Sequence, residues 1–129
     1  MKDLAITVVV NGKLEDVCQR VVETIKPAGF GVLTRIDFDK TIKQKIGESI
    51  QPCIILGACN PKLAFEAYQQ SSDVALLIPC NIVLTEIAEN KIRVEAMRPS
   101  QMLNILPAVQ TSDLMAVAES KLKESLTSL

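Results

Sequence analysis

The stretch Pro52-Cys53-Ile54-Ile55-Leu56-Gly57-Ala58-Cys59-Asn60-Pro61 predicts a buried strand that passes directly into a helix. Its apolar run ends at Cys59 and is bounded on both sides by proline or asparagine, which is typical of a strand covered on both faces. Asn60 belongs to the residue types that cap helix N-termini best, and proline is favoured at the first helical position. This strand and helix lie in the middle of the chain, with the other predicted elements before and after them.

Four elements are predicted ahead of this centre. They are a strand within residues 1–10, a helix over Leu14–Ile25 that ends at Pro27 and Gly29, a strand over Phe30–Phe38, and a short helix capped by Asp39 and ended by Gly47. The first helix has apolar residues three and four positions apart, whereas Phe30–Phe38 alternates without a break. The N-terminal half therefore contributes two strands and two helices.

The chain after the centre predicts a hairpin and two more helices. They are a long strand over Val74–Ile87, a turn at Glu89-Asn90, a strand over Ile92–Arg98, a short helix between Pro99 and Pro107, and a long final helix from Ser112 to Leu126 that covers the sheet. Because proline cannot donate to a strand ladder, we expect an irregularity at Pro79 that re-aims the Cys80 side chain.

Length, composition and charge limit the functions that the chain can have. Its 129 residues suit a single domain over residues 1–129, and 48% apolar with 22% charged residues is ordinary globular usage. With a net charge of −1 and no basic stripe, we expect no nucleic-acid partner. The longest apolar stretch is shorter than the roughly 20 residues that span a bilayer, so we expect no membrane partner either.

The chain contains no histidine, and this excludes the most common catalytic arrangements. Ser-His-Asp and Cys-His pairs, His-based zinc sites and imidazole proton transfer are all ruled out. The five glycines form no phosphate-binding loop, and we expect no cofactor. Four cysteines without a secretion signal predict a cytoplasmic protein with free thiols.

The candidate site residues are two cysteine-asparagine pairs and one arginine. Cys59 stands before a helix N-terminus, where the positive end of the helix dipole should lower the pKa of a thiol. Cys80 follows Pro79. Asn81 and Asn60 bring amide groups, and the Arg98 guanidinium can meet an anionic ligand.

If their strands are neighbours, Cys59 and Cys80 are expected to form a reversible disulfide or to give two ligands to zinc or copper(I). The alternative that both cysteines only pack in the core stays open, because cysteine is among the most buried residue types. Capping alone also explains Asn60.

The order of Ile55-Leu56-Gly57-Ala58-Cys59-Asn60-Pro61 and Leu77-Ile78-Pro79-Cys80-Asn81-Ile82-Val83 resembles the domain of unknown function 302 family. The Gly29-Phe30-Gly31-Val32 stretch and the hairpin leading to Arg98-Pro99 match its layout. The resemblance implies an α+β fold of the TATA-binding-protein class, a curved antiparallel sheet with one helix after the first strand and a long C-terminal helix. It also implies a cytosolic domain that forms a homodimer, with Cys59, Asn60 and Cys80 in signature positions, and it implies no reaction.

Three hypotheses of function follow. The first is a binding module for a small molecule or soft metal, with Cys59 and Cys80 lining the site. The second is a thiol redox or sulfur-transfer enzyme in which Cys59 attacks and Cys80 resolves. The third is a dimeric structural or interaction module in which the cysteines only pack.

Overall fold

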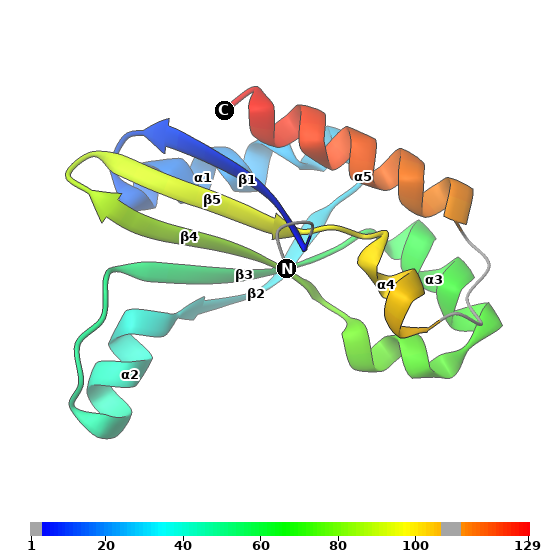
Figure 1. Ribbon diagram of the computed structural model, residues 1–129, viewed down its shortest axis with the longest axis horizontal. Helices are drawn as coiled ribbons and strands as arrows, with labels where there is room; N and C mark the ends of the chain where they lie inside the picture. The colour runs from blue at the N-terminus through cyan, green and yellow to red at the C-terminus, as the bar shows by residue number, and fades with distance from the viewer. Residues whose placement is uncertain (1–3, 107–111) are drawn as a thin grey trace.

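The computed structural model describes residues 4–106 and 112–129, and its elements follow the predicted order (Figure 1). They are β1 (Ala5–Asn11), α1 (Leu14–Thr24), a 3-10 helix (Lys26–Ala28), β2 (Gly31–Asp37), α2 (Phe38–Ile46), β3 (Cys53–Cys59), α3 (Pro61–Gln70), a second 3-10 helix (Ser72–Leu77), β4 (Cys80–Ala88), β5 (Lys91–Met97), α4 (Gln101–Ile105) and α5 (Ser112–Thr127). The strands form one antiparallel sheet in the order β1-β5-β4-β3-β2. The predicted α+β fold with a C-terminal helix is confirmed.

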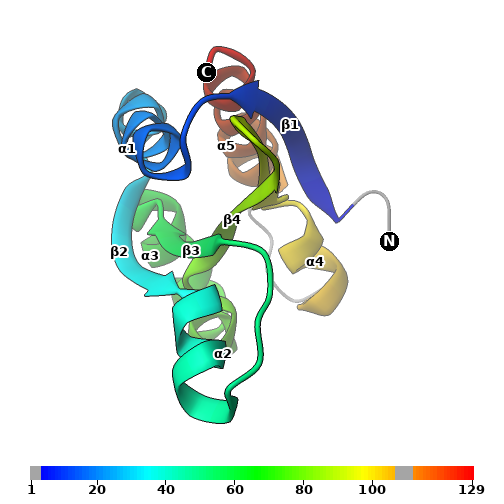
Figure 2. The ribbon, with the colours of Figure 1, turned by 90° about the vertical axis from the view of Figure 1, so that its left-hand side faces the viewer.

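One face of the sheet carries the core. Helices α1 and α5 lie together on that face in both ribbon views (Figures 1 and 2). The apolar side chains that meet there include Val17 and Val21 of α1, Leu56 of β3, Ile82 and Leu84 of β4, Val94 of β5, and Leu122 and Leu126 of α5. Removing these side chains from water is the main force that holds the helices to the sheet.

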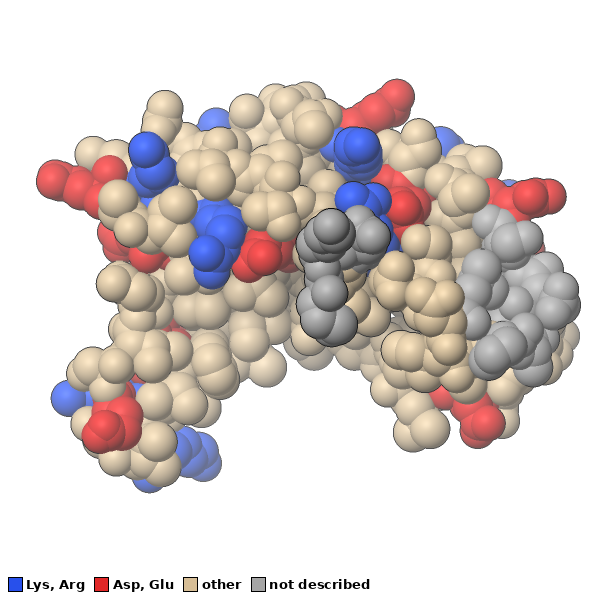
Figure 3. Space-filling model, viewed as in Figure 1, with Lys and Arg blue, Asp and Glu red and all other residues tan. Residues whose placement is uncertain are grey.

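The opposite face of the sheet is hollowed. Figure 3 shows the hollow between α2 at one end and the helices around α3 and α4 at the other. Strand β3 runs from α2 to α3, so its two ends lie in different parts of the molecule (Figure 1). Alternate residues of this strand point to the core face and to the hollowed face.

The junction between β3 and α3 has the predicted form. The Asn60 side-chain oxygen accepts a hydrogen bond from the backbone N–H of Leu63 at 3.2 Å, and Pro61 opens the helix. This bond satisfies one of the N–H groups that every helix leaves unpaired in its first turn. The first residues of α3 are therefore fixed against the end of β3.

The prediction of one long strand over Val74–Ile87 is wrong. Its first part is the 3-10 helix Ser72–Leu77, where the Ser71 hydroxyl oxygen accepts a hydrogen bond from the backbone N–H of Asp73 at 3.3 Å. A short apolar run does not distinguish a strand from a buried helical turn, and Val74 is fully buried in such a turn. Cys80 is the first residue of β4, because Pro79 has no N–H to give to the ladder.

Two local predictions near α2 are also corrected. The alternation of β2 is interrupted by a bulge between Val32 and Thr34, which sends these two side chains to opposite faces. Helix α2 begins at Phe38, so Asp39 lies within its first turn and does not cap it. The Asp39 carboxylate instead accepts a hydrogen bond from the backbone N–H of Cys53 at 3.0 Å, and this bond ties α2 to β3.

Two predicted element ends concern residues outside the ranges that the structure describes. The expected start of the first strand at residues 1–3 and the end of the short helix at Pro107 lie outside the described residues. Among the helices that are described, none has the length and apolar content that crossing a bilayer requires.

Candidate functional site

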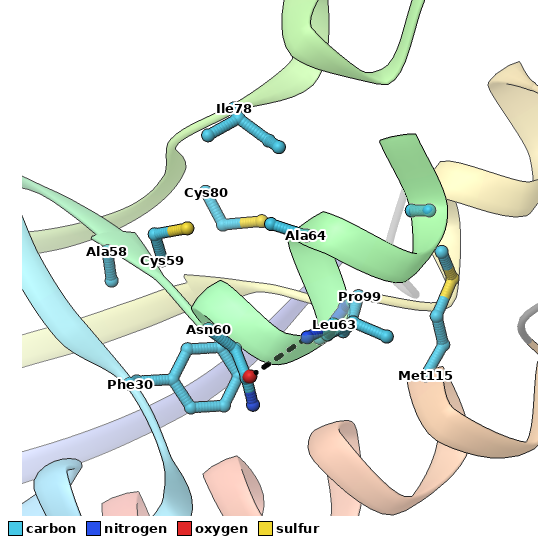
Figure 4. A pocket seen from close by; sticks show the side chains of 11 residues that line it. Phe30, Ala58, Cys59, Asn60, Leu63, Ala64, Ile78, Cys80, Pro99 and Met115 are labelled. Atoms are coloured by element: carbon cyan, nitrogen blue, oxygen red, sulfur yellow. Dashed lines mark hydrogen bonds between the residues drawn. The ribbon is translucent and has the colours of Figure 1, made fainter. Parts of the chain in front are cut away.

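Neighbouring strands bring Cys59 and Cys80 together. In the antiparallel pairing of β3 with β4, Cys80 lies opposite Ala58, one residue from Cys59. Both cysteines line one cavity of about 30 Å³ between the ends of these strands and helix α3 (Figure 4). Since a water needs about 10–15 Å³ measured in this way, the cavity holds about two water-sized groups.

The walls of this cavity are apolar. Besides the two cysteines and Asn60, the lining residues are Phe30, Ala58, Leu63, Ala64, Ala67, Ile78, Pro99 and Met115. The Cys59 thiol points toward Cys80, and the Cys80 thiol points on toward Ala64 of α3 (Figure 4). Among the described lining residues there is no carboxylate, amine or guanidinium, so sulfur atoms are the strongest metal-binding groups at the cavity.

The surroundings raise the thiol pKa values, contrary to the prediction for Cys59. Burial raises the pKa of the Cys59 thiol. Burial also raises the pKa of the Cys80 thiol, and the nearby Cys59 raises it further. The backbone N–H of Leu63 at the helix N-terminus donates its hydrogen bond to Asn60 and not to Cys59. The Cys59 thiol faces apolar walls, where the negative charge of a thiolate is poorly solvated. Both thiols are therefore neutral at neutral pH.

The two asparagines occupy different places. Asn60 lines the cavity while its side-chain oxygen caps α3. Asn81 pairs with Gly57 and is exposed. Because successive residues of a strand point to opposite faces, Asn81 lies on the face away from the Cys80 side chain. The structure therefore groups Asn60 with the thiols and leaves Asn81 apart.

Arg98 lies just after the end of β5 and reaches α5. Its Nη1 donates to Glu119 Oε2 at 3.2 Å, and the backbone N–H of Ser100 donates to Glu119 Oε1 at 3.0 Å. Burial acts to raise the pKa of Glu119, but the hydrogen bonds from Ser100 and Arg98 outweigh it and hold that pKa below its usual value. Arg98 also lines a second cavity, of about 10 Å³, together with Cys80.

The side chains of Thr34 and Pro79 lie close against the backbone of Gly57, next to Cys80. A Cβ atom added to Gly57 would collide with the Thr34 hydroxyl and would lie 2.6 Å from Cγ of Pro79. Pro79 thus packs directly over β3 just before Cys80. A glycine inside an apolar strand is the sequence signal for such an approach.

Sequence reasoning missed the other walls of the cavity. Met115 is fully buried and comes from α5, far along the chain from Cys59. No local pattern connects these two positions, since only the packing of α5 brings them to one cavity. Within the described residues, no group of three or more cysteine, aspartate and glutamate side chains gathers into a metal cluster.

Comparisons with known proteins show a family and a fold. The family model described as domain of unknown function DUF302 matches residues 6–129. Among solved structures, the chain is similar to the crystal structure of an uncharacterised conserved DUF302 protein from Bacillus stearothermophilus, with a TM-score of 0.81 and 23% sequence identity over 96% of each chain. No curated protein matches. At this identity the similarity to the solved structure shows the fold alone.

Proposed function

This chain belongs to the family of the domain of unknown function DUF302, and from its thiol-lined cavity we propose that it is a binding module for a soft metal ion, with copper(I) as the ion that fits best. One observation carries the proposal: Cys59 and Cys80 come from neighbouring strands and line the same small apolar cavity. Thiolates are the protein ligands that soft ions prefer.

The number of ligands favours copper(I) over zinc. Structural zinc sites almost always have four protein ligands, whereas the described lining of this cavity provides two thiols and no imidazole or carboxylate. Copper(I) is stable between two thiolates. The cavity of about 30 Å³ also suits a single ion rather than an organic ligand.

Metal binding explains how buried neutral thiols become ligands. Each thiol gives its proton to water as its sulfur binds the ion, because a coordinating thiol is deprotonated outright. The raised pKa values of Cys59 and Cys80 keep both groups protonated until an ion arrives. A resting nucleophile would need the opposite shift.

Native mass spectrometry in a reducing buffer with one equivalent of copper(I) tests the proposal. The wild-type chain should carry one ion, and the Cys59→Ser and Cys80→Ser variants should each lose it. Cys53→Ser is the matched control, because Cys53 is a buried thiol at the opposite end of β3. Copper retained by Cys59→Ser and Cys80→Ser, or absent from the wild-type chain, would contradict the proposal.

The second candidate function is thiol redox or sulfur-transfer chemistry, which the same neighbouring positions favour. A disulfide between Cys59 and Cys80 would form by exchange with a small disulfide, which takes up two electrons and is released as two thiols. Raised pKa values slow this exchange, since the thiolate is the attacking form. Mass spectrometry after treatment with oxidised glutathione tests it: an internal disulfide in Cys53→Ser that is missing in Cys59→Ser supports this function.

We further propose that the domain is cytoplasmic, which its four free cysteines support, and that it forms a homodimer. The exposed apolar residues Val9, Leu33 and Ile36 on β1 and β2 support self-association, because these are the two edge strands of the sheet. Light scattering after size-exclusion chromatography should give the mass of two chains. The mass of one chain would contradict the dimer.

A further inference from the structure

Arg98 contains a buried hydrogen-bond donor without an acceptor among the described residues. Its Nε is fully shielded from solvent and meets no partner there, whereas its Nη1 donates to Glu119. Buried donors are nearly always paired in folded proteins, because leaving one unpaired costs its full desolvation. An unpaired donor at this place therefore needs an explanation.

The surroundings of this donor point to Cys80. The pairing of β4 with β5 ends at Ile82 and Ala96, and extending this register by two residues would bring Arg98 opposite Cys80. The two residues line the same cavity of about 10 Å³, whose other walls are Leu77, Met97 and Pro99. Apart from the weakly accepting Met97 thioether, the Cys80 sulfur is the side-chain acceptor on this lining.

The guanidinium is also held in place. Glu119 accepts from Arg98 Nη1 with one carboxylate oxygen and from the backbone N–H of Ser100 with the other. Because the guanidinium is a rigid plane, anchoring Nη1 on Glu119 limits the directions in which the Nε–H bond can point. The ion pair with Glu119 therefore helps to orient the Nε–H donor, although Glu119 accepts its hydrogen bond from Nη1.

We propose that Arg98 is a positioning residue of the thiolate site, whose Nε–H donates to the Cys80 sulfur when that sulfur is bound to a metal ion. This inference rests on the proposed function. A thiolate is a stronger acceptor than a thiol, so the bond forms in the metal-bound state. Two thiolates and one copper(I) also carry a net charge of −1, which the guanidinium charge offsets in apolar surroundings.

Competition with a chromophoric copper(I) chelator at one fixed pH tests the role of Arg98. Arg98→Lys keeps the positive charge but has no N–H at the position of Nε, and Arg98→Met removes both. Each variant should still bind one copper(I) ion, with affinity lowered by about 10–100-fold as for other partners that orient metal ligands. The ultraviolet absorption band from thiolate to copper(I) should shift in both.

Three controls separate the possible results, and circular dichroism confirms that each variant is folded. If Cys80→Ser binds copper(I) like the wild-type chain, the proposed function itself fails. If Cys80→Ser loses the ion but Arg98→Lys keeps wild-type affinity and absorption, the function stands and the role of Arg98 is wrong. Glu119→Gln keeps the Nε–H and should have a smaller effect than Arg98→Met. If Glu119→Gln and Arg98→Met lose the same amount of copper(I) affinity, the effect belongs to the ion pair and the proposal is overturned.

Discussion

The two ends of β3 each carry a cysteine, and their surroundings differ. At the α2 end, Cys53 is buried, its sulfur lies 3.9 Å from the Thr85 hydroxyl oxygen in a hydrogen bond donated by that hydroxyl, and its backbone N–H donates to Asp39. At the α3 end, Cys59 is half-buried and faces a cavity that it shares with Cys80. The Cys53 sulfur accepts a hydrogen bond from a hydroxyl, whereas the Cys59 thiol shares its cavity with a second thiol.

This comparison shows that burial alone does not distinguish the cysteine at the cavity from the cysteine at the other end of β3. Burial raises the pKa of Cys53 and of Cys59 alike, and Cys53 is the more buried of the two. The two ends differ instead because the α3 end has a second thiol, Cys80, and a cavity large enough for an ion. Substitutions near one end of β3 at a time test this difference.

The largest effect is expected from Gly57→Ala, close to the α3 end. The new Cβ would collide with the Thr34 hydroxyl and with Pro79, so the sheet must shift, at a cost of about 1–3 kcal/mol in the free energy of unfolding. Urea denaturation measures this loss. Gly31→Ala is the control, because a Cβ there meets nothing within 4 Å. Equal stability of the two variants would show that Pro79 does not pack tightly over β3.

Asn60→Ala should have the next largest effect. It removes the oxygen that accepts from the Leu63 N–H, and losing an N-cap of this kind costs about 0.5–2 kcal/mol. Asn60→Ser keeps a capping oxygen and should stay close to the wild-type chain in the same denaturation experiment. If Ser destabilises as much as Ala, Asn60 acts through its place in the cavity wall instead.

Asp39→Ala changes the opposite end of β3. It removes the acceptor of the Cys53 N–H and should cost about 0.5–1.5 kcal/mol, the net value of an ordinary hydrogen bond. Copper(I) binding should stay unchanged, since Cys59 and Cys80 lie at the other end of the strand. A lower copper(I) affinity in Asp39→Ala would contradict the independence of the two ends.

The smallest effect concerns alkaline pH. Because the pKa of Cys80 is raised in the folded chain, its contribution to stability is complete below the unfolded-state pKa of about 8.5 and is lost as pH rises toward the folded-state value. The free energy of unfolding should therefore fall as pH rises above about 8.5, and it should fall less steeply in Cys80→Ser. Parallel curves for the two proteins would show that Cys80 does not resist ionisation.

Local sequence signals predicted much of the fold. The Asn60-Pro61 junction and the turn at Glu89-Asn90 appear where the residue types require them. The prediction of a strand at Val74 is wrong, because an apolar run followed by Pro79 fits either a strand or a buried 3-10 turn. The prediction that Asp39 caps α2 is wrong, because the hydrogen-bond partner of its carboxylate comes from β3 and not from its own helix.

The sequence predicted only part of the candidate site: it indicated Cys59, Asn60 and Cys80 but not the apolar walls, and Asn81 lies apart from the cavity. The sequence indicated Cys59 and Cys80, and the pairing of β3 with β4 brings them to one cavity. The direction of the Cys59 pKa shift depends on apolar walls such as Met115, which come from distant parts of the chain. The local sequence around Cys59 shows the helix N-terminus but not these walls, so it predicted the opposite direction of the pKa shift.

X-ray absorption at the copper edge tests most directly whether the two thiols form a soft-metal site. The protein to use is the Cys18→Ser, Cys53→Ser double variant loaded with one equivalent of copper(I), because only Cys59 and Cys80 then remain as thiols. Our proposal predicts a first coordination shell of two sulfur atoms. A shell of oxygen or nitrogen atoms, or copper that is lost on desalting, would contradict it.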